Sequence, residues 1–174
     1  LNTGKPLKSP TPLTFIRLGT SGTIQANIEL DSLIVAEAAI GFDNLMHYYE
    51  PSMCEHPIAV SLHSKLGMSK NLNHPYYIDG DSVLVDDCLK LGMSKGIIVT
   101  NPGFYAPQGR HLRTKNILPY DLNEFIHFNY KDSKITNFDM ETSGIYGLSH
   151  VMGHRAISIS AILANRFHST FSNQ

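Results

Sequence analysis

An arginine followed closely by two glycines and two hydroxyl side chains is the first feature that could do chemistry. Arg17 stands just before Gly19, Thr20, Ser21 and Gly22. The guanidinium and the hydroxyls are hydrogen-bond donors, and the glycines let a ligand approach the backbone amide groups. The stretch therefore predicts an oxyanion site, for which phosphate is the natural ligand. It has no P-loop lysine, so a tight turn with a structural arginine is an open alternative.

A second group of functional side chains lies further along the chain. Phe104 and Tyr105 precede Gln108 and Arg110. An amide both donates and accepts hydrogen bonds, a guanidinium donates, and the aromatic rings offer faces for stacking. This combination suits the edge of a planar, amide-like base. The alternative is a solvated polar loop with one packed aromatic side chain.

A carboxylate completes the set. Glu141 follows Asn137 and Asp139, either of which could cap a helix, so we expect it in the first helical turn. The helix macrodipole favours an acidic side chain there whether or not it binds a ligand. However, one carboxylate can also accept hydrogen bonds from two neighbouring hydroxyls, such as those of a ribose. Together the three groups predict a ligand with a phosphate, a ribose and a base.

The elements that must position these residues alternate between strands and helices. Apolar, β-prone runs predict strands at residues 14–18, 32–40, 96–100 and 155–163. Helices are predicted over residues 79–91, capped by Asp81 or Ser82 and stopped by Gly92, and from the Asn137–Asp139 cap to about Gly153. Residues 43–77 read as loops around one short element. This alternation predicts an α/β protein, with ligands at loops that leave the strand ends after Leu18, Thr100 and Leu163.

Composition excludes several classes of protein. The 174 residues fit one domain, and Lys plus Arg (14) nearly balance Asp plus Glu (15), so we expect neither a nucleic-acid nor a membrane partner. Cys54 and Cys88 lie far apart, which predicts neither a disulfide framework nor a zinc site. His150 and His154 lack a third ligand nearby, so no metal is expected. No apolar run or signal peptide points to export, and we expect a cytoplasmic protein.

In order along the chain, these motifs resemble those of nucleoside phosphorylases of the hexameric type, and uridine phosphorylases most of all. The resemblance covers about residues 14 to 166. Its motifs are Arg17 to Gly22, Phe104 and Tyr105 through Gln108 to Arg110, Asp139 to Glu141, and Ala164 to Arg166.

The resemblance implies a fold, a reaction and a role for each matching residue. The fold is a three-layer α/β structure with a central mixed sheet flanked by helices. The reaction is phosphorolysis of a nucleoside to a free base and ribose 1-phosphate, with inorganic phosphate as co-substrate and no cofactor. Arg17, Glu141 and Arg110 are the implied catalytic residues. The implied phosphate ligands are Arg17, Gly19 and Thr20; the ribose ligands are Thr20, Met140 and Glu141; the base ligands are Gly22, Phe104, Gln108, Arg110 and Arg166.

The loop after the last strand indicates the kind of base. Purine phosphorylases and related nucleosidases carry an aspartate there, whereas this chain has Leu163, Ala164, Asn165 and Arg166. The resemblance therefore implies a pyrimidine nucleoside, and a homodimer or larger homo-oligomer with shared sites. A nucleosidase that uses water, or a nucleoside-binding module without turnover, are the alternatives.

Some motifs of the family are not found in these residues. They are the upstream glycine-rich phosphate loop with its arginine, the N-terminal histidine lent by a neighbouring subunit, and the C-terminal helix. We therefore expect residues 1–174 to be one domain that is incomplete at both ends.

Overall fold

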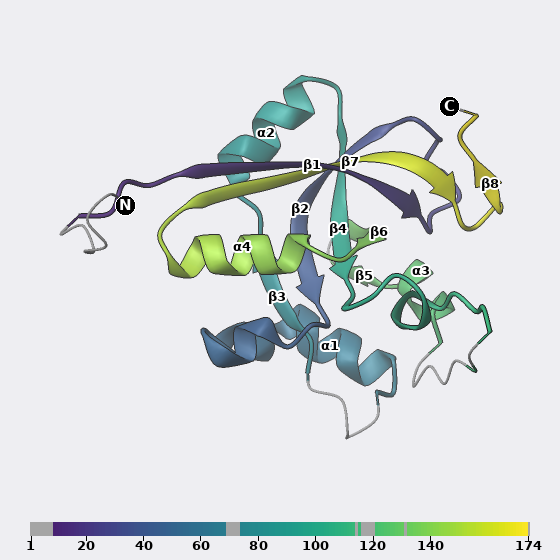
Figure 1. Cartoon of the computed structure of the whole chain (residues 1–174), viewed down its shortest axis with the longest axis horizontal. Coiled ribbons are helices and arrows are strands. Elements are labelled where there is room, and N and C mark those ends of the chain that lie inside the picture. Colours follow the sequence, from purple (N-terminus) through teal and green to yellow (C-terminus); the bar gives the residue numbers. More distant parts are fainter. Residues whose placement is uncertain (1–8, 69–73, 114, 116–120, 131, 174) are drawn as a thin grey trace.

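A mixed sheet that closes on itself forms the centre of the structure (Figure 1). The computed structural model describes residues 9–68, 74–113, 115, 121–130 and 132–173. Its strands are β1 (Thr14–Thr23), β2 (Leu33–Gly41), β3 (Tyr76–Asp79), β4 (Ser94–Thr100), β5 (Asn129–Tyr130), β6 (Ser133–Asp139), β7 (Arg155–Asn165) and β8 (Thr170–Phe171). Its helices are α1 (Pro57–Lys65), α2 (Ser82–Lys90), α3 (Asn123–Ile126) and α4 (Thr142–Val151), with the short 3-10 helices η1 (Leu45–Tyr48), η2 (Pro51–Glu55) and η3 (Ala106–Gln108).

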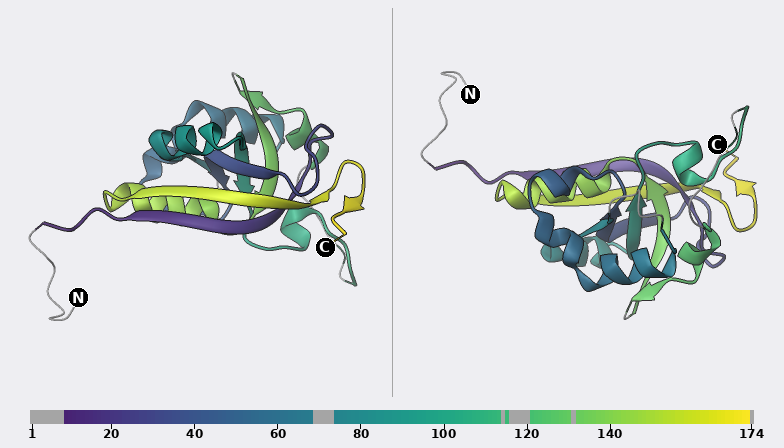
Figure 2. Two further views of the ribbon diagram at one scale, coloured as in Figure 1. Left: turned by 90° about the horizontal axis from the view of Figure 1, so that it is seen from above. Right: turned by 90° about the horizontal axis from the view of Figure 1, so that it is seen from below.

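The strand pairings explain the closure. The order is β3-β2-β4-β6-β1-β7-β8, and β2 also pairs with β7, so β2, β4, β6, β1 and β7 form a closed ring. The pairs β2–β4, β4–β6 and β1–β7 are parallel, whereas β1–β6, β2–β7 and β2–β3 are antiparallel. The predicted mixed sheet is thereby confirmed. The longest pairing joins β1 and β7, which run side by side along one border of the molecule (Figure 2).

Helices cover both faces of this sheet. Neighbouring residues of a strand point to opposite faces, and here they enter different apolar clusters. Ile97 packs in a cluster with residues of α1 and α3, whereas Ile98 packs in another with Tyr146 of α4. A third cluster joins α2 to Ile157 of β7. The predicted α/β architecture with flanking helices is therefore confirmed.

Several local predictions are confirmed. The strands predicted at residues 32–40 and 96–100 are β2 and β4. Helix α2 is capped by Asp81, whose carboxylate accepts a hydrogen bond from the Leu84 amide at 3.0 Å. Gly92 follows with a φ of +84°, a conformation that favours glycine and ends the helix.

Other local predictions are wrong. The predicted tight loop at Gly19–Gly22 is the second half of β1, because these residues pair with residues 160–164 of β7. Residues 133–139, left unassigned to any strand, form β6 between β4 and β1. Residues 43–77 hold η1, η2, α1 and β3 rather than one short element. The first residues are rich in Pro, Gly, Ser and Thr, which predicts a loop, but residues 1–8 lie outside the described residues.

Within the described part of the chain, no helix combines the length and the apolar character that a membrane crossing needs.

The hydroxyl of Tyr146 links α4 to two strands beside the candidate site. It donates to the Ala36 carbonyl at 2.7 Å and accepts from the Ser158 amide at 2.8 Å, all within the core. Tyr146→Phe leaves both buried groups unpaired, so we expect it to lower the free energy of unfolding by about 2 to 3 kcal/mol. Urea denaturation measures the loss. Tyr48→Phe, at an 84% exposed tyrosine, is the control, and equal stabilities of the two variants would contradict this account.

Candidate active site

A cavity of about 510 Å³ brings together every predicted site residue except Arg166. It is lined by Arg17, Gly19, Thr20, Ser21, Gly22, Phe104, Gln108, Arg110, Phe138, Asp139, Met140, Glu141, Leu163, Ala164 and Phe171. Residues separated by more than a hundred positions in the sequence thus share one concave surface. The roles predicted for the individual residues remain predictions, but their proximity is a property of the fold.

Three neighbouring strands explain this proximity. Arg17 to Gly22 lie on β1, and Gly22 pairs with Phe138 of β6. The carboxyl end of β4 lies beside the end of β6, where Thr100 pairs with Asp139. The chain leaves β4 into the loop that holds Phe104 to Arg110, and it leaves β6 into Met140, Glu141 and α4. The order of these strands therefore places the residues of β1, of the loop after β4 and of the turn after β6 around one cavity.

Glu141 contacts Arg17 at the polar end of the cavity. Arg17 Nη2 lies 2.6 Å from Glu141 Oε2, and the Glu141 side chain is 47% exposed. Glu141 occupies the N-cap position of α4, not its first turn, and its side chain makes no cap hydrogen bond. The expectation of a first-turn carboxylate is therefore wrong by one position. The carboxylate instead faces the arginine and the open cavity, as a ligand-binding group would.

Asp139 provides the cap in place of Glu141. Its carboxylate accepts hydrogen bonds from the Thr142 amide at 3.1 Å, from the Thr142 hydroxyl and from Thr100 Oγ1 at 2.6 Å. Arg17 Nη2 lies 3.7 Å from Asp139 Oδ2. Burial raises the pKa of Asp139, while the hydroxyl hydrogen bonds and the arginine oppose that rise. A buried carboxylate thus joins β6, α4 and the arginine.

The other end of the cavity is formed by the loop after β4. Arg110 Nη1 donates to Gln108 Oε1 at 2.5 Å and to the Phe104 carbonyl at 2.7 Å. The Arg110 guanidinium carbon lies 3.7 Å from the centre of the Phe104 ring. Burial lowers the pKa of Arg110 from its ordinary value. The contacts with Arg110 and the Asp139 carbonyl fix the orientation of the Gln108 amide, which is almost fully buried.

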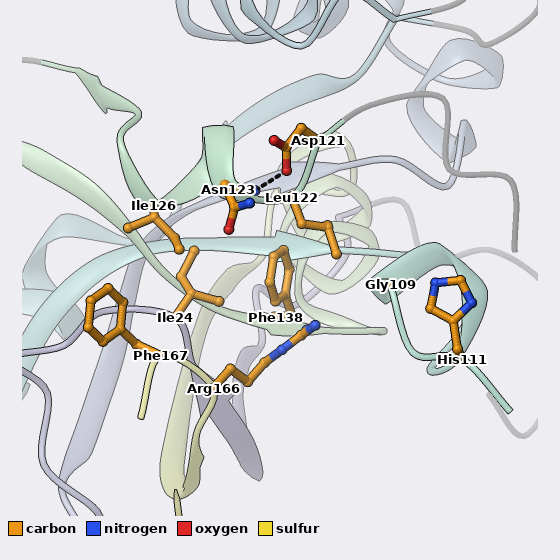
Figure 3. A pocket seen from close by; sticks show the side chains of 10 residues that line it. All are labelled: Ile24, Gly109, His111, Asp121, Leu122, Asn123, Ile126, Phe138, Arg166 and Phe167. Carbon is orange, nitrogen blue, oxygen red and sulfur yellow. Dashed lines mark hydrogen bonds between the residues drawn. The ribbon is translucent and has the colours of Figure 1, made fainter. Parts of the chain in front are cut away.

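Arg166 supports this loop from behind. Its Nη2 donates to the Gln108 carbonyl at 2.7 Å, and its side chain lines a neighbouring cavity of about 570 Å³ instead of the first one. Figure 3 shows this cavity, with the Arg166 guanidinium beside the Phe138 ring at 5.3 Å. The structure thus places Arg166 against the backbone of the Phe104–Arg110 loop and outside the lining of the first cavity, and its predicted role toward a base stays a prediction.

Ser21 and Asn165 take part in the fold. The Ser21 hydroxyl donates to the Phe138 carbonyl at 2.7 Å, so it links β1 to β6, and its predicted donation to an anion stays a prediction. Buried Asn165 donates to the carbonyls of Gln25 and Ile28 and accepts from two backbone amides that follow it. Asn165, which the sequence places in the loop that indicates the kind of base, is instead the last residue of β7, and its side chain makes hydrogen bonds within the protein.

Sequence reasoning missed several lining residues. Asp139 belongs to a motif of the resemblance but has no predicted role beyond that of a possible helix cap, and neither Phe138 nor Phe171 has a predicted role. Phe138 lies three residues after Ile135 in β6, with Thr136 and Asn137 between them, so no alternation of apolar and polar residues pointed to it. Phe171 lies on the two-residue strand β8, which is too short for a periodic signal.

A comparison with protein families shows which superfamily the chain belongs to. Residues 6–172 match the model of the phosphorylase superfamily. The match covers nearly the whole sequence, and the chain belongs to this superfamily.

Two curated relatives and one solved structure carry names that are narrower than the superfamily. The chain is 29% identical to a uridine phosphorylase of Thermococcus kodakarensis over 161 residues, which are 91% of this chain and 50% of the relative. It is 23% identical to a uridine phosphorylase of Haemophilus influenzae, over 92% of this chain and 57% of the relative. The chain therefore spans about half the length of the curated relatives it matches.

The solved structure supports the fold. It is a nucleoside phosphorylase of Trypanosoma brucei, described as showing uridine phosphorylase activity, with a TM-score of 0.79 and 22% identity. The match covers 92% of this chain and 57% of the other.

The exposure of Glu141 predicts that its ion pair adds little to the stability of the fold. Glu141→Gln should change the free energy of unfolding by less than about 1 kcal/mol, because exposed ion pairs contribute little. Chemical denaturation measures the change. Glu124→Gln is the matched control, since Glu124 is 42% exposed and pairs with Lys65 at 3.7 Å. A loss well above that of the control would show that Glu141 chiefly holds the fold.

Proposed function

We propose that this chain forms the nucleoside site of a phosphorylase that cleaves a pyrimidine nucleoside, such as uridine, into a free base and ribose 1-phosphate. The observation that carries the proposal is one cavity with three kinds of surface. Arg17 and Thr20 suit phosphate, Met140 and Glu141 suit ribose, and the Phe104–Arg110 loop suits a base. The uridine phosphorylases among its relatives support this reading.

The proposed chemistry at the sugar is electrostatic. As the glycosidic bond stretches, positive charge develops on the ribose, and phosphate and Glu141 are the anions that stabilise it. Arg17 binds the phosphate with charge-assisted hydrogen bonds, and the Glu141 carboxylate accepts hydrogen bonds from the ribose hydroxyls. Binding phosphate and ribose next to each other lowers the barrier further. The reactants lose their translational and rotational freedom on binding, so this loss no longer adds to the barrier of the chemical step.

The departing base carries the opposite charge. Gln108 and Arg110 stabilise the negative charge on the pyrimidine, and the Phe104 ring packs near the base. The Arg110 guanidinium already lies over Phe104 and bonds to Gln108, so these groups are held in place before a substrate arrives. Arg166 contributes through the loop carbonyl that it binds.

We also propose a co-substrate, a cellular role and an oligomeric state for the protein. Inorganic phosphate is the co-substrate, and no cofactor takes part. The protein acts in pyrimidine salvage in the cytoplasm, as a homodimer or a larger homo-oligomer with shared sites.

Incubation of the chain with uridine, inosine and thymidine, each with and without phosphate, tests the proposal. We expect base release from uridine only when phosphate is present, with ribose 1-phosphate as the second product. Chromatography of base and sugar products measures this. Release without phosphate would indicate a nucleosidase, and binding without release would indicate a module that does not turn over its ligand.

The proposed role of Arg110 makes a second prediction. Arg110→Ala removes a donor for the charge that develops on the base, so turnover should fall by roughly 100-fold. The KM for phosphate should change much less, because Arg110 contacts Phe104 and Gln108 and not the residues assigned to phosphate. Steady-state kinetics at varied phosphate separates these effects, with Arg113→Ala, at an exposed arginine in the same region, as the control. Unchanged turnover in Arg110→Ala would contradict the assignment.

A further inference from the structure

We propose that Asp139 is a positioning residue: it serves as a permanent counter-charge for Arg17 and so leaves the Glu141 carboxylate available to the ribose. This inference rests on the proposed function. It concerns a residue that borders the cavity but is almost fully covered by protein, since the Asp139 side chain is only 2% exposed.

The Arg17 guanidinium lies between two carboxylates that differ in burial. Its Nη2 is 2.6 Å from Glu141 Oε2 and 3.7 Å from Asp139 Oδ2. Both border the cavity, but the Glu141 side chain is 47% exposed, whereas the Asp139 side chain is only 2% exposed. A ligand can therefore compete for Glu141 but not for Asp139. Of the two anions, Asp139 is the one that stays with the arginine throughout a reaction.

A second route connects Arg17 to the same carboxylate. Arg17 Nη1 donates to Ser158 Oγ at 3.4 Å, and Ser158 Oγ lies 2.8 Å from Thr142 Oγ1. The Thr142 hydroxyl in turn donates to Asp139. The parallel pairing of Arg17 with Ser158 holds the first step of this chain in register. Arg17 is thus held to Asp139 directly and through two hydroxyls.

The surroundings of Asp139 suit a carboxylate that stays ionised. Buried charges are stable only when they are paired and hydrogen-bonded. Asp139 accepts from Thr100, from the Thr142 amide and from the Thr142 hydroxyl, and Arg17 supplies the opposite charge. Burial raises the pKa of Asp139 on balance, and these donors together with Arg17 limit that rise, so the charged form depends on them.

The two carboxylates share one cation, Arg17, so a change in the charge of Asp139 alters the electrostatic environment of Glu141. If Asp139 loses its charge, Glu141 becomes the sole anion paired with Arg17 and a weaker acceptor for ribose hydroxyls. Nucleoside binding should then weaken. Phosphate binding should not weaken, because one negative charge near the arginine has been removed. A variant that merely disturbed the site would weaken both substrates.

Asp139→Asn tests this, since it removes the charge and keeps the shape. We expect the KM for uridine to rise about tenfold and the KM for phosphate to stay at or below that of the unmodified chain. Asp43→Asn is the matched control. Asp43 also accepts hydrogen bonds, from Tyr76 and Ser143, next to the start of α4. Among the described residues, the acidic partners of Arg17 are Asp139 and Glu141, not Asp43. It should leave both KM values unchanged.

A second variant covers the case in which Asp139→Asn does not fold. Ser158→Ala removes the indirect route and leaves Asp139 intact, so it should raise the KM for uridine about two- to fivefold without raising that for phosphate. Circular dichroism checks that each variant is folded.

The outcomes separate this inference from the proposed function. Equal weakening of uridine and phosphate, or no change in either, overturns the positioning role alone. If the unmodified chain binds neither substrate, the proposed function fails and this inference fails with it.

Discussion

The ion pair between Arg17 and two carboxylates is the interaction on which the candidate site depends. Arg17 comes from β1, Asp139 ends β6, and Glu141 directly precedes α4, so one guanidinium joins three elements. Asp139 is the buried member and also holds the start of the helix. The position of Glu141 at the cavity follows from that arrangement, because it is the second residue after the buried aspartate.

The closed sheet makes this arrangement possible. β6 lies between β4 and β1, so the loop after β4 and the turn after β6 open beside the glycine-rich half of β1. In that half, Gly19 lies against the guanidinium of Arg17: a Cβ on Gly19 would lie 2.4 Å from Arg17 Nη1. A side chain at this position would displace the arginine. Glycine is therefore required there for packing against the site, and no turn is needed to explain it.

Much of the fold and most of the site could be predicted from the sequence. Residues 32–40 and 96–100 were recognisable as strands because they are apolar and bounded by glycine or proline, and Asp81 with Gly92 marked the ends of α2. Strand β6 was missed because Asn137 and Asp139, which end it, are also favoured helix caps. The continuation of β1 was missed because Gly19 and Gly22 signal turns locally, whereas pairing with β7 decides their conformation. Asp139 was not recognised as part of the site, since its contacts with Arg17 and Thr100 come from distant segments.

A crystal structure of the chain with uridine and sulfate, as an unreactive substitute for phosphate, tests the central claim most directly. The account predicts sulfate on Arg17 and Thr20, ribose hydroxyls on Glu141, and the pyrimidine beside Phe104 and Gln108, with Asp139 still next to Arg17. Uridine bound in the neighbouring cavity beside Arg166, or sulfate bound away from Arg17, would contradict it.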